Sequence, residues 1–193
     1  MSVLKEYEVI KKALEGEKLD CCVIEDSICL IIDIMESWLD SYEYTKDFDV
    51  LMHAIREDYL YSGTLYRGIT LSKSTEDLKD RVSFSKIQSF SKEKKVAINF
   101  ATNNLVTEGE EINMTKKPEE VIPVIIEFTG KNIGVDLNKF SGDLIDICRN
   151  LIRDKEKAGD FEELLNYAIE EKEVLVYPRS LSENDKNIAL YAI

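Results

Sequence analysis

The sequence predicts an α+β fold in which a helical N-terminal part precedes a mixed core of strands and helices. Up to residue 62 the apolar residues recur at helical spacing, and Ser62-Gly63 then breaks that pattern. Residues 121–129 (VIPVIIEFT) are rich in β-branched side chains and are typical of a buried strand. With 193 residues, no repeat and no linker, the chain fits one domain, helical over 1–62 and mixed over 63–193.

Three helices are expected in the first part, at residues 4–14, 20–42 and 47–61, with Gly16 ending the first. Their inward side chains are predicted to be Leu4, Tyr7, Ile10 and Leu14, then Val23, Ile31, Ile34, Trp38 and Leu39, then Phe48, Leu51, Met52, Ile55 and Tyr59.

The mixed part begins with extended stretches at 64–70 and 82–90. Ser91 can cap a helix with apolar positions at Val96, Ala97, Phe100 and Ala101, and the polar stretch 102–120 is expected to be a mobile surface loop. After the strand at 121–129 we expect helices at 141–153 and 160–169. Asp160-x-x-Glu163 is a capping-box pattern for the second of these. Strands at 171–177 and 187–193, joined through a turn at 178–180, complete the prediction.

Composition is that of an ordinary soluble globular protein, with 44% hydrophobic and 33% charged residues. The net charge of -13 argues against nonspecific binding to a nucleic-acid backbone. It fits either a basic protein partner or solubility alone.

Four cysteines without metal-ligand spacing and a single histidine predict no metal site, and reduced thiols in an intracellular protein. The N-terminus has no apolar signal core. The longest apolar run, residues 28–35, is too short to span a bilayer and is broken by Asp33, so a cytoplasmic protein without a transmembrane segment is expected.

Three short motifs carry the candidate chemistry. Arg67, in Leu65-Tyr66-Arg67-Gly68, is costly to bury unless an anion pairs with it, and its guanidinium suits a diphosphate; a structural salt bridge is the alternative. Gly68 lets a ligand approach the backbone. In Gln88-Ser89-Phe90-Ser91, Ser89 could bond a ribose hydroxyl or orient a carboxylate.

The third motif is the glutamate pair in Glu171-Lys172-Glu173. On a strand, Glu171 and Glu173 would share one face about 7 Å apart, where like charge raises one carboxyl pKa. The alternative is a solvated acidic turn after a helix.

Together the motifs resemble the arginine-serine-glutamate class of mono-ADP-ribosyltransferases, found among bacterial toxins, phage effectors and animal ecto-enzymes. The chain has TLYRGI, then KIQSFSKEKKVAINFA with Ser89-Phe90-Ser91 in place of Ser-Thr-Ser, then EEKEVLVYP with the Glu-x-Glu pair. The resemblance covers residue 64 to the C-terminus. A sister class needs a catalytic histidine, and His53, in the third expected helix, does not fit that role.

The resemblance implies a split β-sheet around a cleft that holds NAD as substrate. Glu173 would stabilise the oxocarbenium-like ribose, while Glu171 would position or deprotonate the acceptor. A glutamate at the position of Glu171 implies that the acceptor is an arginine side chain. Arg67 would hold the phosphates or ribose, Gly68 would meet the nicotinamide amide, and Ser89 would steady Glu173 and the ribose.

Two aromatic residues have two interpretations each. Phe100 would lie against nicotinamide or be a core residue of its helix. Tyr167 lies in the target-recognising segment or packs its helix. Relatives carry an arginine shortly after the aromatic, where this chain has Thr102, Asn103 and Asn104, so a second phosphate-binding residue is not identified from sequence.

The leading expectation is therefore NAD-dependent ADP-ribosylation of a bacterial host or target-cell protein, with neither nucleic acid nor membrane as partner. A phage effector and an exported toxin both fit. The alternatives are an NAD glycohydrolase toxin and a non-enzymatic acidic binding module of the same fold. The oligomeric state is not predicted.

Overall fold

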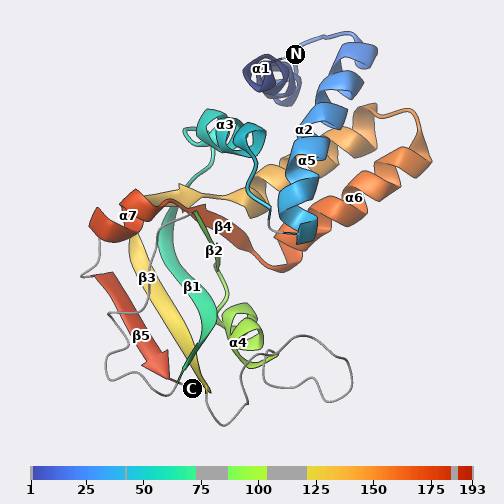
Figure 1. The fold of residues 1–193 in the computed structure, drawn as a ribbon. Helices are drawn as coiled ribbons and strands as arrows, with labels where there is room; N and C mark the ends of the chain where they lie inside the picture. The colour runs from blue at the N-terminus through green and yellow to red at the C-terminus, as the bar shows by residue number, and fades with distance from the viewer. Residues whose placement is uncertain (1, 42, 73–86, 104–120, 184–186, 193) are drawn as a thin grey trace. The chain divides into compact units, whose positions relative to one another are not determined.

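The computed structural model describes residues 2–41, 43–72, 87–103, 121–183 and 187–192. It is a mixed α and β structure, as expected, with seven helices and one five-stranded sheet in the described residues (Figure 1). Contacts divide the chain into a helical unit, Met1–Leu60 with Val135–Glu170, and a sheet unit, Tyr61–Gly134 with Glu171–Ile193. The helical unit thus includes two helices from the segment that the sequence assigns to the mixed core.

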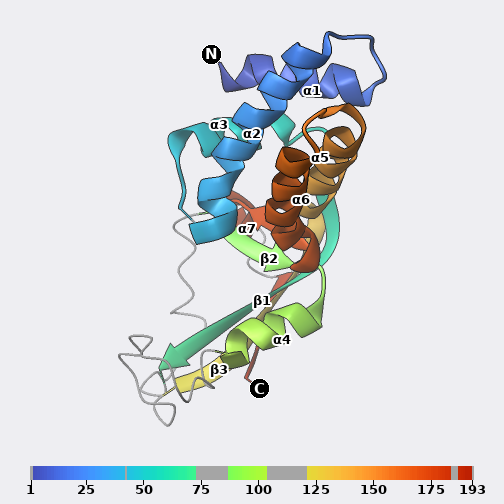
Figure 2. The same ribbon diagram turned by 90° about the vertical axis from the view of Figure 1, so that its right-hand side faces the viewer.

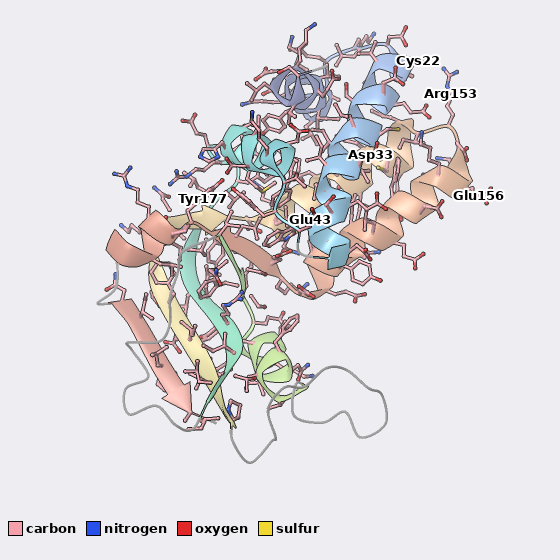
Figure 3. All side chains as sticks on the ribbon, viewed as in Figure 1. Cys22, Asp33, Glu43, Arg153, Glu156 and Tyr177 are labelled. Carbon is pink, nitrogen blue, oxygen red and sulfur yellow. The ribbon has the colours of Figure 1, made fainter. Side chains whose placement is uncertain are left out.

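The helical unit contains α1 (Val3–Leu14), α2 (Cys21–Ser41), α3 (Lys46–Ile55), α5 (Leu137–Leu151) and α6 (Lys155–Glu170). Figures 1 and 2 show α5 and α6 side by side, and α1 packs on α2 and α3. Phe140, fully buried on α5, meets the rings of Tyr7 and Tyr59 edge-on, at centroid distances of 6.2 and 5.1 Å. Asp33, which interrupts the apolar run of α2, lies on its exposed side (Figure 3).

A polar cluster joins α1 to the segment after α3. The Tyr7 hydroxyl donates to Asp58 Oδ2 at 2.7 Å, and Lys11 Nζ donates to both Asp58 oxygens at 2.9 Å. The hydrogen bonds from Lys11 and Tyr7 hold the pKa of Asp58 below its ordinary value.

The predicted inward faces are largely correct, with three exceptions. Leu4, Leu14 and Val23 are 52%, 39% and 47% exposed. On α1 the buried stripe runs instead through Val3, Tyr7 and Ile10, so Leu4 falls beside it and Leu14 ends the helix. On α2 the buried face includes Ile24, Ile28 and Ile31, and Val23 lies off that face.

Three helix boundaries also differ from prediction. α5 starts at Leu137 rather than at residue 141, because Asp136 caps it by accepting the Lys139 amide. α3 ends at Ile55 rather than near residue 61, although Tyr59 beyond it is buried. α6 starts at Lys155, so Asp160 lies inside the helix. Asp154 caps it instead, because its Oδ1 accepts hydrogen bonds from the amides of Glu156 and Lys157 at 3.1 and 3.3 Å.

The described part of the sheet unit contains five strands and two helices, namely β1 (Leu60–Ser72), β2 (Gln88–Ser91), α4 (Lys94–Asn103), β3 (Val121–Val135), β4 (Glu173–Val176), α7 (Pro178–Glu183) and β5 (Ile188–Ala192). The strand order in the sheet is β1-β2-β4-β3-β5. An additional pairing of β1 with β3 closes the first four strands into a ring, and β5 pairs with β3 alone among the described strands.

The two faces of this sheet are packed differently. One face carries an apolar cluster that includes Leu65, Phe90 and Val174. The other face receives α4, whose Ala97 packs with Ile125 and the partly buried Tyr66. We call the second one the α4 face.

Several strand predictions need correction. The stretches expected at 64–70 and 121–129 are parts of longer strands, β1 and β3. Residues 178–180 begin a helix, α7, where a turn is predicted. Residues 82–86 and 104–120, the latter most of the expected loop, lie outside the described residues, whereas Thr102 and Asn103 belong to α4.

Candidate functional site

The three motifs lie on neighbouring strands of the sheet unit. β2 pairs antiparallel with β1 on one side and with β4 on the other. Ser91 is the Cα partner of both Tyr66 and Glu173, so the arginine, serine and glutamate motifs meet in one row across the sheet. Directly opposed residues of antiparallel strands share a face, which places Tyr66, Ser91 and Glu173 together on the α4 face. Ser89, opposite Leu175, lies on this face as well.

Glu173 is a carboxylate in a fully buried strand. Its side chain is 1% exposed, and the following Val174, Leu175 and Val176 are 0% exposed. An acidic side chain is uncommon in a buried strand, because burying a carboxylate is costly unless partners compensate it. Departures of this kind from local folding rules are expected at functional sites.

Glu171 does not share the strand with Glu173, contrary to the sequence prediction. β4 begins at Glu173, and the intervening Lys172 has a positive φ of 53°. The two-residue alternation that would place both carboxylates on one face therefore does not apply. The Lys92 amide donates to the Lys172 carbonyl at 3.0 Å, which ties this turn to the residue after Ser91. The half-buried Glu171 thus precedes the strand in a fixed turn.

Arg67 joins β1 to β2. It alternates with Tyr66 along β1, so its Cβ points away from the α4 face, toward the side of Leu65. Its guanidinium reaches the neighbouring strand, where Nη1 donates to the Ser89 carbonyl at 2.5 Å. The arginine and serine motifs are therefore in direct contact, through a backbone acceptor.

Gly68 has a packing reason to be glycine. A Cβ added here would lie 1.9 Å from the Ala97 carbonyl oxygen and 2.7 Å from the Ala101 amide nitrogen, both backbone atoms of α4. The Thr70 hydroxyl also donates to the Ala101 carbonyl, at 3.5 Å. The backbone of α4 therefore makes a close approach to Gly68.

Ser91 stabilises the turn that leads into α4. Its buried Oγ accepts the Glu93 amide at 3.0 Å. Because α4 begins at Lys94, the serine lies three residues before the first residue of the helix and is not its immediate cap.

Phe100 and Tyr167, for which the sequence leaves two interpretations each, are both exposed. Phe100 on α4 is 43% exposed and Tyr167 on α6 is 51% exposed, so neither is a core residue of its helix. Tyr167 lines a hollow on α6, within the helical unit, together with Glu163, Asn166 and Glu170. Phe100 belongs to the sheet unit, as do the other predicted site residues.

Lys94 lies close to the site, although the sequence motifs do not identify it as a candidate. Its ammonium lies 6.0 Å from the centre of the Tyr66 ring and 5.2 Å from that of Tyr191 on β5. The available signal was the run Lys92-Glu93-Lys94-Lys95 directly after the serine motif, in a strongly acidic chain. Tyr191 gave no signal, because only the pairing of β5 with β3 brings it to this face.

Over the described ranges, no group of three or more His, Cys, Asp and Glu side chains is placed to hold a metal ion. None of the helices found there has the length and apolarity that crossing a membrane requires. Comparisons of the chain with protein-family models, with curated proteins and with solved structures found no match.

Proposed function

We propose that this protein is a mono-ADP-ribosyltransferase that moves ADP-ribose from NAD to an arginine of a target protein and releases nicotinamide. The observation that carries the proposal is the row formed by Tyr66, Ser91 and the buried Glu173. Motifs far apart in sequence come together there, which supports the proposal. In this proposal the sheet unit is an ADP-ribosyltransferase-like core around an NAD cleft.

The chemistry assigned to the site is a substitution at the ribose. The bond between C1′ and the nicotinamide nitrogen breaks, and nicotinamide leaves with the bonding electrons as a neutral molecule. Glu173 accepts a hydrogen bond from a ribose hydroxyl and stabilises the positive charge that develops on the ring. A guanidinium nitrogen of the acceptor then bonds to C1′ and gives its proton to Glu171. Starting from a turn, Glu171 can approach the acceptor from outside the strand.

Arg67 and Ser89 form the second part of the site. Their hydrogen bond fixes the strand that carries Ser89, which positions the ribose and Glu173 in this proposal. Arg67 holds a phosphate or ribose oxygen through its guanidinium. Gly68 keeps α4 close to β1 while its backbone meets the nicotinamide amide, and the exposed ring of Phe100 stacks on nicotinamide.

The biological setting belongs to the same proposal. The target is a bacterial host or target-cell protein that meets the enzyme in the cytoplasm, and the acidic chain attracts a basic partner. A phage effector or an exported toxin would each work in this way.

The test is nicotinamide release from NAD by the purified protein, with and without bacterial lysate, compared with Glu173→Gln. We expect release that depends on lysate and falls at least about 100-fold in the variant, the lower range for removing one catalytic group. Glu127→Gln is the matched control, because Glu127 is a half-buried glutamate of β3 outside the motifs. Circular dichroism and thermal unfolding establish that both variants fold.

Each other outcome has a definite meaning. Release without lysate identifies water as the acceptor and makes the protein an NAD glycohydrolase. No release from folded wild-type protein contradicts the enzymatic proposal and leaves the non-enzymatic acidic binding module. Equal release by Glu173→Gln and wild type would show that the buried carboxylate is structural.

A further inference from the structure

Glu173 and Arg67 start on different faces of the sheet. Glu173 shares the α4 face with Tyr66 and Ser91, whereas strand alternation directs the Cβ of Arg67 to the other side. One Arg67 nitrogen also donates to a backbone carbonyl. A cation that starts from the α4 face would therefore approach a dinucleotide at Glu173 from the glutamate's own side of the sheet, and would add to the contact assigned to Arg67.

Lys94 is such a cation. It is the first residue of α4, three positions after Ser91, and its ammonium lies near the ring of Tyr66, which is opposite Ser91. Tyr191 belongs to the same face, because its partner on β3 is Ile125, which packs against α4. The ammonium is thus held near two rings on the face that carries Glu173.

We propose that Lys94 binds a diphosphate oxygen of the dinucleotide on the α4 face, with Tyr66 and Tyr191 holding its ammonium in place. The inference rests on the proposed function and supplies the phosphate contact that the motifs leave open. Lys94 would act as a binding residue, with no role in breaking the glycosidic bond.

The surroundings of Lys94 favour an anionic ligand. Of the carboxylates in the described ranges, none lies within 4.0 Å of its ammonium, whereas Lys11, Arg149 and Lys157 each have one. Ring contacts orient an ammonium without neutralising it, since an aromatic face carries no net charge. The full positive charge therefore stays available in a protein whose net charge is -13.

The experiment measures the KM for NAD and the Kd for ADP-ribose, which keeps the diphosphate but lacks nicotinamide. We expect Lys94→Gln to raise both about tenfold, as for loss of one charge-assisted hydrogen bond, and to leave kcat within about twofold. Lys94→Arg should restore most of the affinity. Lys95→Gln, one residue further along α4, removes the same charge from a lysine that has no ring contact among the described residues, and should change neither constant. Tyr191→Leu should shift both in the direction of Lys94→Gln.

The outcomes separate this proposal from the proposed function. If wild type releases nicotinamide and Lys94→Gln has unchanged KM and Kd, Lys94 is not the phosphate contact, but the proposed enzymatic activity is still supported. An equal loss in Lys95→Gln would also overturn the proposal, because it would indicate a general charge effect. ADP-ribose binding that needs Lys94, in a protein that releases no nicotinamide, would support the site and refute the transferase. Wild type that binds neither ligand would refute both.

Discussion

Replacing Gly68 with alanine adds one methyl group where the backbone of α4 lies against β1. The new Cβ would be 1.9 Å from the Ala97 carbonyl oxygen, about 1.5 Å short of the 3.4 Å at which ordinary contact begins. Because the obstructing atoms belong to the backbone, no change of side-chain rotamer can relieve the clash. The helix must move away from the strand or the strand must bend.

Overpacking of this kind costs about 1–3 kcal/mol, and the distance here favours the upper end or beyond. A chain of this size loses about 2–4 °C of Tm for each kcal/mol. We therefore expect Gly68→Ala to unfold roughly 5–12 °C below wild type in a thermal melt followed by circular dichroism.

The control is a glycine with room for a methyl group. Gly142 on α5 and Gly159 on α6 have nothing within 4 Å of an added Cβ, and alanine there should stabilise the protein by about 0.4–1 kcal/mol. A Gly68→Ala protein as stable as wild type would refute the packing of α4 on β1. Unchanged stability with lost NAD turnover would instead show that a ligand makes the close approach to Gly68.

Three further predictions concern the helical unit. Asp154→Ala should destabilise the protein by about 0.5–2 kcal/mol in urea unfolding because it removes the α6 cap, whereas Asp160→Ala inside the helix should have little effect. The hydrogen bonds from Lys11 and Tyr7 lower the pKa of Asp58 in the folded protein. These bonds therefore stabilise the fold above pH 3.8, the ordinary pKa of the group, and the stabilisation is lost as the pH falls through the lowered pKa of the folded state. The stability difference between wild type and Asp58→Asn should therefore be larger at pH 7 than at pH 3; equal differences would contradict the linkage. Burial raises the pKa of the Cys148 thiol to about 12, so iodoacetamide at pH 8 should label the exposed Cys22 first and Cys148 only after unfolding, as mass spectrometry can determine.

Elements with strong local periodicity were predictable from the sequence. Phe48, Leu51, Met52 and Ile55 recur at helical spacing, and all four are buried on α3. Boundaries were harder where two local signals compete. Asp154 and Asp160 can each cap a helix, and because α5 already ends at Leu151, the first is free to start α6.

The sequence motifs identify the residues of the proposed site as candidates, but they do not predict the faces of the sheet on which these residues lie. Arg67 and Glu173 point to different sides because strand pairing sets the register, and pairing depends on packing between distant segments. Glu171 departs from prediction through the positive φ of Lys172, a conformation that lysine rarely adopts. Pro178 is compatible with two structures, because proline occurs in turns and also suits the first turn of a helix. The sequence analysis predicts a turn at this position, whereas the structure has the start of α7.

The interleaving of the two units limits what deletion can achieve. The chain passes from one unit to the other after Leu60, Gly134 and Glu170, so neither unit is a continuous stretch of the gene product. A fragment of residues 63–193 would contain α5 and α6 without the three helices that precede them in the same unit. Such a fragment would expose apolar surface that α1 and α2 normally cover, and we expect it to aggregate. Substitutions in the full-length chain are therefore the appropriate way to separate folding from chemistry in this protein.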